Sequence, residues 1–335
     1  MIGKDDKIDF LAIGDIVIDA FIRLKDANVA CKIDTDACEL CLRFGDKVPY
    51  ESVTVLPAVG NSPNAAVSAS RLGLKVGLLS NIGDDKHGQD CIAQLQKEKI
   101  STEYISVEEN KITNYHYVLW YDVDRTILIK HTEFEYKLPP LPPVAWVYLS
   151  SLSENSLIYH FEILEFLKNN PETKLAFQPG TFQIKFGTEK LKEVYSRTEV
   201  FFCNVEEAQK ILNTTEKNIL ILSTGIQALG PKMVVISDGP DGAYLYTNDE
   251  LWHMPIYPDI HPPFERTGAG DAFSSTFTSM LALGKTPLEA LALAPINSMS
   301  VVQKIGAQEG LLSREKMLEY LQNAPENYEA KKINQ

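Results

Sequence analysis

The sequence predicts an α/β protein whose central sheet is mostly parallel and is covered by helices. The chain has 335 residues, of which 44% are apolar, and this is enough for a sizeable core. Short apolar runs typical of buried strands alternate with stretches of helical character along most of the chain. Because such alternation places helices on the faces of a parallel sheet, and no internal repeat or linker interrupts it, we expect one domain over residues 1–335.

Apolar runs rich in β-branched residues predict the strands of the main sheet. Residues 10–21 begin as a buried strand and continue as its extension. Residues 64–72 and 89–99 have the character of helices, the second of them amphipathic. Further strands are expected at residues 75–79, 144–149, 174–177, 199–203 and 233–237.

The last third of the chain is strongly helical. Residues 274–283 have helical character, Thr286 begins a capping box that includes Glu289, and Ser313 predicts the start of a last helix. The tail, residues 325–335, is polar, so we expect it to be frayed.

Two regions interrupt the alternation, at about residues 20–56 and 112–131. The first mixes polar and apolar residues without a helical period. In the second, two β-type runs flank Asp122-Val-Asp-Arg125, which predicts a β-hairpin. We expect these regions to form a small sheet that stands off the main domain, either as a lid over a ligand cleft or as a homodimer surface.

The composition excludes several classes of protein. A net charge of −13 argues against a nucleic-acid partner, since phosphate backbones are bound by clustered Lys and Arg. No run of about 18 apolar residues appears, so we expect no membrane span. The charged N-terminus lacks the apolar stretch of a signal peptide, which favours a cytoplasmic location.

The chain contains five cysteines, Cys31, Cys38, Cys41, Cys91 and Cys203. Their odd number and the expected location favour reduced thiols. The spacing of Cys38 and Cys41, with Cys31 nearby, leaves open a metal or redox site, although a fourth zinc ligand is not evident. The alternative is that these three are small, partly buried residues in an extension.

The segment Arg266-Thr-Gly-Ala-Gly-Asp-Ala-Phe273 carries the predicted chemistry. Because a helical stretch follows it, Gly268, Ala269 and Gly270 lie at a helix N-terminus, where free backbone amides and the helix dipole favour an anion such as a phosphoryl group. Asp271 lies beside this site and could accept a proton from an attacking hydroxyl. The alternative is that Asp271 only caps the helix.

This segment resembles the C-terminal signature of the ribokinase-like (PfkB) carbohydrate kinase family. Other stretches resemble further motifs of that family and occur in the family order over nearly the whole chain. They are Val59-Gly-Asn-Ser-Pro-Asn-Ala-Ala-Val-Ser-Ala-Ser-Arg-Leu-Gly73, Val76-Gly-Leu-Leu-Ser-Asn-Ile-Gly-Asp-Asp-Lys-His-Gly88, Asn204-Val-Glu-Glu207, Ser237-Asp-Gly-Pro-Asp-Gly242 and Lys304-Ile-Gly-Ala-Gln308. Each match is weak alone, but together they are specific.

The resemblance implies a ribokinase-like three-layer α/β/α fold with a small β lid. It implies ATP-dependent phosphorylation of a hydroxymethyl group, with Asp271 as the general base and the amides of Gly268, Ala269 and Gly270 as the anion hole. The acceptor would be a sugar, a sugar phosphate or a nucleoside, as in an adenosine-type kinase. A non-catalytic ligand-binding protein on the same fold is a weaker alternative, because such a protein needs no base.

The resemblance also implies the ligand contacts. Glu207 would organise Mg²⁺ through water, which suits an ion that keeps several waters and prefers oxygen ligands. The alternative for Asn204 and Glu207 is a strand end followed by a helix start. The implied nucleotide contacts are Asn204, Ser237, Gly239, Gly242 and Asn297, and the implied substrate contacts are Asp19, Gly60 and Asn64. Asp15 is an alternative to Asp19.

Several positions depart from the family pattern. Val59, Asn61 and Val17 differ from what ribokinases have, which weakens a specific ribokinase assignment. Glu265-Arg266 replaces the frequent Asp-Thr pair that frames a monovalent-cation site, which puts K⁺ activation in doubt, and Arg266 could reach a nucleotide phosphate. Phe177-Gln-Pro-Gly180 also departs from the family. Four aromatic residues of the hairpin could stack on a nucleoside base or pack an interface: Tyr115, Tyr117, Trp120 and Tyr121.

Overall fold

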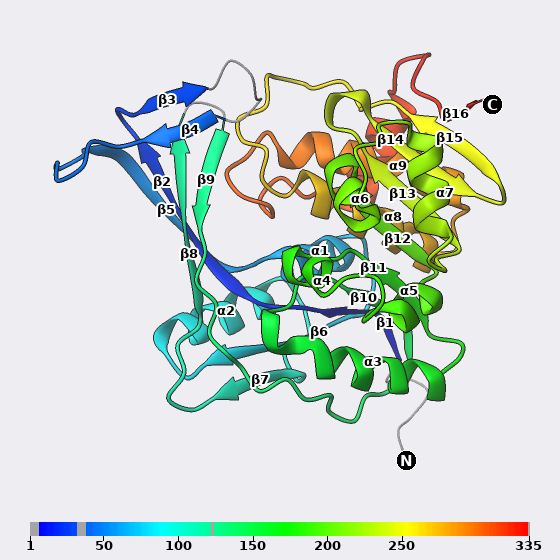
Figure 1. Cartoon of the computed structure of the whole chain (residues 1–335), viewed down its shortest axis with the longest axis horizontal. Helices are drawn as coiled ribbons and strands as arrows, with labels where there is room; N and C mark the ends of the chain where they lie inside the picture. Colours follow the sequence, from blue (N-terminus) through cyan, green and yellow to red (C-terminus); the bar gives the residue numbers. More distant parts are fainter. Residues whose placement is uncertain (1–6, 32–37, 122–123, 334–335) are drawn as a thin grey trace.

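The computed structural model describes residues 7–31, 38–121 and 124–333. Its largest element is a ten-stranded sheet that runs through the body of the molecule (Figure 1). From β7 to β13 in the following order, all neighbours pair in parallel, and from β13 to β16 they pair antiparallel. The order is β7 (Ile105–Glu108), β6 (Val76–Gly83), β1 (Ile8–Ile13), β10 (Val144–Leu149), β11 (Lys174–Phe177), β12 (Val200–Asn204), β13 (Met233–Ser237), β14 (Ala243–Thr247), β15 (Glu250–Met254) and β16 (Lys331–Ile333).

Helices cover both faces of this sheet, which confirms the expected three-layer α/β/α fold. Successive residues of β1 point into two separate cores: Phe10 and Ala12 into one, Leu11 and Ile13 into the other. The first core is covered by α1 (Asn61–Arg71), α2 (Lys86–Lys97), α8 (Ala269–Ala282), α9 (Pro287–Val301) and α10 (Arg314–Gln322). The second is covered by α3 (Leu157–Asn169), α5 (Lys192–Arg197), α6 (Val205–Leu212) and α7 (Ile219–Gln227).

The single strand with an extension expected at residues 10–21 is two strands in different sheets. β1 ends at Ile13, and β2 (Val17–Leu24) belongs to a second sheet. Gly14 lies in the turn between them, where a Cβ would be 2.5 Å from Ser62 Oγ and 2.8 Å from the Ser151 carbonyl oxygen. Glycine is therefore needed at this turn, because the chain passes against two neighbouring segments.

The second sheet has four strands and stands off the main body as an arm (Figure 1). Its order is β5 (Tyr50–Val59), β2, β8 (Asn114–Tyr121) and β9 (Asp124–Leu128), and we call it the lid sheet. A hairpin of β3 (Asn28–Cys31) and β4 (Cys38–Cys41) lies near the end of this arm. β8 and β9 pair antiparallel as expected of a hairpin, while residues 122–123 of its turn lie outside the described residues.

The inner face of the lid sheet is buried, whereas its outer face exposes apolar side chains. Asp19 and Phe21 on β2 are buried beside His116 and Val118, their partners in register on β8. The outer face exposes Val53, Val55, Tyr117 and Leu128. An exposed apolar face of this kind is typical of protein interaction sites, and homodimerisation through the lid sheet stays a prediction.

The cysteines of the β3–β4 hairpin differ from what was expected. Cys31 and Cys38 stand opposite one another in the register of the hairpin, and Cys38 is disulfide-bonded. The expectation of reduced thiols is therefore wrong for Cys38. Cys41 is free and exposed, whereas Cys91 and Cys203 are free and buried. Within the described residues, no three His, Cys, Asp or Glu side chains gather in a way that could hold a metal ion.

The tail of the chain is docked rather than frayed. Residues 331–333 form β16, which pairs antiparallel with β15. Tyr328 is only 9% exposed, and its hydroxyl donates to the Ala292 carbonyl oxygen at 2.6 Å. The prediction from the polar composition of the tail is therefore wrong, because one buried aromatic ring and one edge strand are sufficient to anchor it.

Among the described residues, none of the helices is both long and apolar enough to traverse a bilayer.

Replacing Tyr328 by Ala tests this docking. The variant removes a buried ring that also contacts Tyr257, with 5.0 Å between ring centroids, so we expect a loss of about 3–5 kcal/mol in the free energy of unfolding. Urea unfolding measures it. Tyr50, which is 59% exposed, provides the matched Tyr→Ala control, for which we expect a change below about 0.5 kcal/mol. Equal, small effects in both variants would contradict a docked tail.

Candidate active site

α8 begins at a turn that requires glycine. Gly268 is the N-cap residue and has a left-handed backbone, with φ at 84°. A Cβ at this position would overlap the side chain of Ala307. Ala269 and Gly270 follow in the first helical turn, where N–H groups lack an intrahelical acceptor, and no described residue accepts a hydrogen bond from either. The start of α8 therefore offers free amides and the positive end of the helix dipole to an anion.

Asp271 lies on the same turn and is held by three side-chain amides. Asn61 Nδ2 donates to Oδ1 and Asn64 Nδ2 donates to Oδ2, each at 2.8 Å. Gln178 Nε2 donates to Oδ1 at 3.2 Å. The two asparagines come from the first turn of α1, and Gln178 follows the end of β11. Three amides from two segments distant in sequence thus fix both oxygens of one carboxylate.

The ionisation of Asp271 reflects two opposing effects. Burial raises the pKa of its carboxyl group above the ordinary value of 3.8, and the negative charge of Asp19 adds to this rise. The hydrogen bonds from Asn64, Asn61 and Gln178 lower the pKa, because they stabilise the ionised form. The net effect is a raised pKa, so the ionised carboxylate accepts a proton more readily than that of an ordinary Asp.

A cavity of about 490 Å³ opens beside the start of α8. Tyr257, Met299 and Val302 contribute apolar wall, which suits a flat aromatic base. Six of the residues predicted for nucleotide or phosphate binding line it: Asn204, Ser237, Gly239, Gly242, Ala269 and Gly270.

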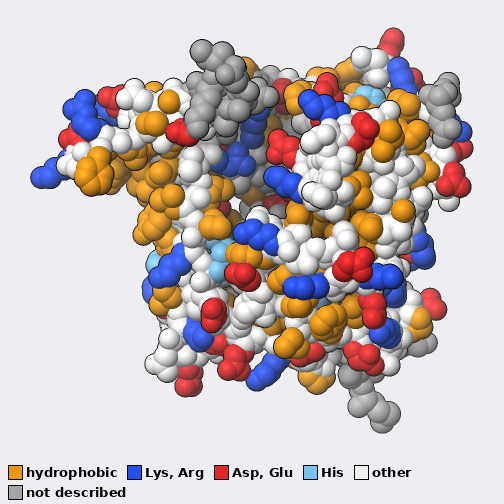
Figure 2. Space-filling model, in the orientation of Figure 1, with side chains coloured by type: hydrophobic (Ala, Val, Ile, Leu, Met, Phe, Trp, Pro, Cys, Tyr) orange, Lys and Arg blue, Asp and Glu red, His pale blue; other side chains and the backbone are white. Residues whose placement is uncertain are grey.

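The molecule is hollowed between the arm of the lid sheet and the main body, with basic side chains on the walls of the hollow (Figure 2).

A second cavity, of about 150 Å³, adjoins the first at Gly270. Asn204 and Glu207 lie on its wall and form a capping box at the start of α6. Burial raises the pKa of Glu207, and the backbone hydrogen bond from Asn204 opposes that rise. Only Oε2 of Glu207 is used in the capping box, at 2.9 Å from Asn204 N, so a second carboxylate oxygen is available to a hydrated cation.

Asn297 is separate from these cavities. It is fully buried, its Nδ2 donates to Thr276 Oγ1 at 2.8 Å, and its Oδ1 accepts from Leu312 N at 2.9 Å. The next residue, Ser298, lines the larger cavity instead. Asn297 thus faces the packed side of α9, whereas Ser298 faces the cavity. A direct contact between Asn297 and the nucleotide stays a prediction.

On the other side of Asp271, the inner face of the lid sheet carries Asp19. Its Oδ1 is buried without a hydrogen-bond partner, and His116 Nδ1 lies 3.4 Å away. His116 Nε2 is likewise buried without a partner. Asp15, the alternative, is already engaged, since Tyr136 Oη donates to its Oδ1 at 2.7 Å and Ser153 Oγ donates to its Oδ2 at 2.8 Å. Asp19 therefore keeps the free hydrogen-bonding capacity.

Gly60 and Asn64 lie where the lid sheet meets α1. Gly60 is the N-cap residue of α1 with φ at 113°, and a Cβ there would be 2.8 Å from the Asp15 carbonyl oxygen. Asn64 is 4% exposed. Both predicted substrate residues thus lie beside Asp271 and Asp15, at the junction of the lid sheet and the main body.

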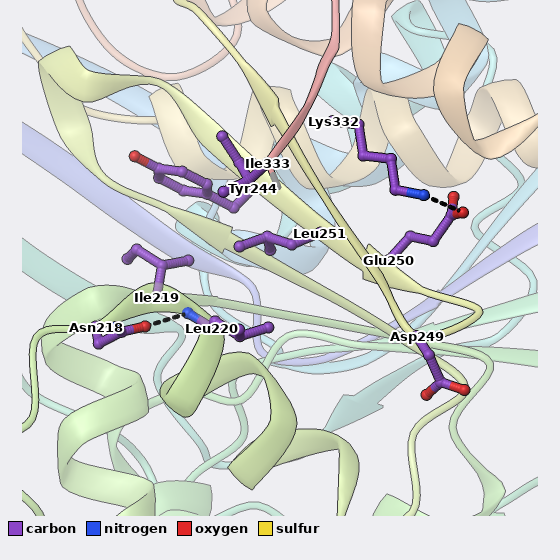
Figure 3. A pocket seen from close by; sticks show the side chains of 9 residues that line it. All are labelled: Asn218, Ile219, Leu220, Tyr244, Asp249, Glu250, Leu251, Lys332 and Ile333. Atoms are coloured by element: carbon purple, nitrogen blue, oxygen red, sulfur yellow. Dashed lines mark hydrogen bonds and ion pairs between the residues drawn. The ribbon is translucent and has the colours of Figure 1, made fainter. Parts of the chain in front are cut away.

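A larger cavity, of about 750 Å³, is lined by other residues than this site (Figure 3). It lies between the start of α7 and the edge strands β14, β15 and β16. Its polar groups are satisfied: Asn218 caps α7, and Lys332 pairs with Glu250 at 2.5 Å. None of the predicted site residues lines it, so size alone does not mark the active site of this protein.

Sequence reasoning missed the contacts that hold Asp271. Asn61 and Gln178 were noted only as departures from a family pattern, and His116 was not noted at all. The available signal for Gln178 was its place directly after a parallel strand, because side chains at the carboxyl ends of such strands line ligand crevices. No comparable local signal identifies His116, since its position opposite Asp19 depends on the pairing of β2 with β8.

Together, the parallel sheet, the free amides of α8 and the adjoining cavities are the features expected of a small-molecule kinase. The model of the pfkB family of carbohydrate kinases matches residues 27–314, and the chain belongs to this family. It is therefore a phosphotransferase that acts on an alcohol group, as the carbohydrate kinases of this family are.

The chain is also similar to characterised kinases in sequence and in fold. An ATP-dependent 6-phosphofructokinase of Thermoanaerobacterium thermosaccharolyticum is 23% identical over 92% of each chain. A nucleoside kinase of Methanocaldococcus jannaschii has a similar structure, with a TM-score of 0.75 and 18% identity over 96% of this chain and 99% of that chain. An Arabidopsis thaliana ribokinase complexed with ribose and ATP also has a TM-score of 0.75, at 18% identity over 94% and 98%. The solved neighbours include a complex with ATP and Mg²⁺.

The variant Gly268→Ala tests the turn before α8. The new Cβ meets Ala307 and strains a left-handed backbone, so the start of α8 must shift, and we expect kinase activity to fall about 100-fold or more. ADP release from Mg·ATP with an accepted sugar or nucleoside measures it.

Gly284→Ala is the matched control, because Gly284 also has a positive φ, 82°, but has no atom near its would-be Cβ. Backbone strain alone should cost about 1–2 kcal/mol of stability there and leave turnover intact. If the two variants lose activity equally, backbone strain and not the geometry of the anion site explains the loss.

Proposed function

We propose that this chain transfers the γ-phosphoryl group of ATP to a hydroxymethyl group of a sugar or nucleoside. The supporting observation is the arrangement on the first turn of α8, where free backbone amides adjoin a carboxylate that three neutral amides hold in place. Asp271 accepts the hydroxyl proton while the acceptor oxygen forms its bond to phosphorus and the bond to the bridging oxygen of ADP breaks. The amides of Gly268, Ala269 and Gly270 stabilise the charge on the phosphoryl oxygens.

The acceptor in this proposal is a polyol whose hydroxyls contact the lid sheet. Asp19 Oδ1 accepts one hydroxyl, and His116 Nε2 contacts an adjacent one, since both atoms are buried and lack protein partners. The backbone of Gly60 and the amide of Asn64 border the same space. Closure of the lid sheet over the acceptor would exclude water and thereby limit hydrolysis of ATP.

The aromatic residues of the lid do not favour a nucleoside over a sugar. Tyr117 is 48% exposed on the outer face. Trp120 is buried on the inner face, where it packs edge-on against Phe264 and carries the Arg23 guanidinium 4.8 Å from its ring centroid. Because Trp120 is buried and already engaged by Phe264 and Arg23, we assign it no stacking role, and a sugar is the acceptor class to test first.

Mg²⁺ fits the small cavity between Gln178 and Glu207. The free carboxylate oxygen of Glu207 and the side-chain amide of Asn204 supply the polar groups that a hydrated Mg²⁺ contacts. When bound, the ion neutralises charge on the phosphate oxygens. Arg266 lines the larger cavity and is placed to contact a nucleotide phosphate.

A monovalent cation such as K⁺ also has a candidate position, despite the replacement of Asp-Thr by Glu265-Arg266. Glu265 is 1% exposed, and its Oε2 has no hydrogen-bond partner. Thr267 Oγ1 is also buried without a partner. A buried carboxylate with a free oxygen is costly unless a cation or donor compensates it, which favours a cation beside the start of α8.

Asp271→Asn tests the central role in this proposal. The amide keeps the shape of the side chain but cannot accept a proton, so we expect kcat to fall by about 10²–10⁴ while ADP binding, measured by calorimetry, is retained. Asp249→Asn, in an exposed turn, is the matched control and should keep wild-type turnover. Wild-type kcat in the Asp271 variant would refute the assignment of the base.

Asp19→Asn tests the acceptor site. Loss of the carboxylate removes the charged acceptor for a substrate hydroxyl, so we expect KM for the acceptor to rise about tenfold or more while KM for ATP is unchanged. Initial rates at varied acceptor and fixed ATP measure the change. Asp26→Asn, on an exposed part of the lid region, is the control. An unchanged acceptor KM in both variants would exclude Asp19 as a substrate contact.

A further inference from the structure

One of the amides that hold Asp271, that of Asn64, is itself held in one orientation. An amide group can turn so that either its nitrogen or its oxygen faces a neighbour, and only the nitrogen can donate to a carboxylate. Asn64 Oδ1 accepts a hydrogen bond from Gln308 Nε2 at 3.0 Å, which leaves Asn64 Nδ2 to face Asp271. The orientation of Asn64 therefore depends on that of Gln308.

Gln308 is oriented in turn by the backbone. Its Nε2 also donates to the Ala58 carbonyl oxygen at 2.7 Å. A carbonyl oxygen can only accept, so the nitrogen of Gln308 must face Ala58 and Asn64. The chain of bonds from Ala58 through Gln308 and Asn64 to Asp271 thus has one possible direction, fixed by a backbone group that cannot reverse.

Further contacts hold Ala58 and Gln308 in place. Ala58 has φ at 57°, in the left-handed region that non-glycine residues seldom occupy, and its N–H donates to Cys91 Sγ at 3.2 Å. On the other side, Arg71 Nη1 donates to the Gln308 carbonyl oxygen at 2.8 Å, and the same guanidinium is paired with Glu98. Gln308, which is 8% exposed and lies in a loop, is thereby fixed through its side chain and its backbone.

We propose that Gln308 is a positioning residue for the phosphoryl transfer. It orients the amide of Asn64 so that the amide nitrogen donates to Asp271, and this hydrogen bond favours the ionised carboxylate and fixes its orientation. This inference rests on the proposed role of Asp271 as the base. Gln308 contacts neither of the two cavities, and its effect on the reaction passes through Asn64 alone.

A similar arrangement holds the third amide. Gln178 Oε1 accepts hydrogen bonds from the Tyr148 hydroxyl and from Ser274 Oγ, the second at 3.0 Å, so Gln178 Nε2 is left to face Asp271. Hydroxyl groups can both donate and accept, so this second chain of bonds can reverse. The amide of Gln308 donates directly to a carbonyl oxygen, whereas Gln178 reaches the carbonyl oxygen of Gly270 only through the hydroxyl of Ser274, which lies 2.8 Å from it. This makes Gln308 the sharper test.

Gln308→Glu reverses the polarity of the chain with little change of shape. A carboxylate at this position cannot donate to Asn64, so the amide of Asn64 should turn its nitrogen toward the new acid and its oxygen toward Asp271. We expect kcat at neutral pH to fall about 10–100-fold and the acidic limb of the kcat profile to move to higher pH, because the ionised form of Asp271 loses a donor. KM for ATP should not change.

Gln308→Met removes the donor without adding a charge. If thermal melts show that the Glu variant is not folded, the Met variant tests the positioning role instead. It should show a smaller loss of kcat with the acidic limb moved in the same direction. Gln303→Glu, in the same loop, is the matched control and should keep the wild-type profile, because the Gln303 side chain donates to the His261 carbonyl oxygen and not to Asn64.

The outcomes separate this inference from the proposed function. If Asp271→Asn is inactive but folded Gln308 variants keep the wild-type kcat and pH profile, the positioning role is refuted and the base stands. A loss of kcat without movement of the acidic limb also refutes it, since a packing defect alone would give that result. If Asp271→Asn retains wild-type turnover, the proposed function itself fails.

Discussion

Asp271 imposes the constraint on which the proposed site depends, because in the proposed mechanism its carboxylate must be ionised beside a phosphoryl group that also carries negative charge. Neutral amides solve this problem better than a cation, since they favour the ionised form without cancelling the charge that draws the proton. Asn61, Asn64 and Gln178 supply such donors from α1 and from the end of β11. The packing of α1 against α8 is therefore as much a part of the site as the glycines of the anion hole.

The architecture explains how these groups come together. In a parallel sheet the carboxyl ends of neighbouring strands meet at one edge, and Gln178, Asn204 and Ser237 follow or end β11, β12 and β13 there. The start of α8 enters the same edge through the tight turn at Gly268. Ala307 packs against that glycine, and Leu56 of the lid sheet lies against Gly306 in the same loop. The loop thus contacts the lid sheet and the anion site together.

The sequence predicted the alternating elements and the residues at helix and strand ends, because apolar periodicity and glycine turns act locally. β10, β11 and β13 have the predicted bounds, and Thr286 and Ser313 cap their helices as expected. What could not be predicted depends on contacts between distant segments. The pairing that brings His116 to Asp19, the orientation of Gln308 and the inward face of Asn297 all arise from packing, and a one-residue rotation of a helix is invisible in a short pattern.

The most direct test of the central claim is a crystal structure with Mg·ADP and aluminium fluoride, which imitates the phosphoryl group in transfer. The account predicts that the fluoride complex lies within hydrogen-bond distance of the backbone amides of Gly268, Ala269 and Gly270, with the Asp271 carboxylate facing its acceptor side. A fluoride complex bound away from the start of α8, or an Asp271 side chain turned from it, would contradict the account.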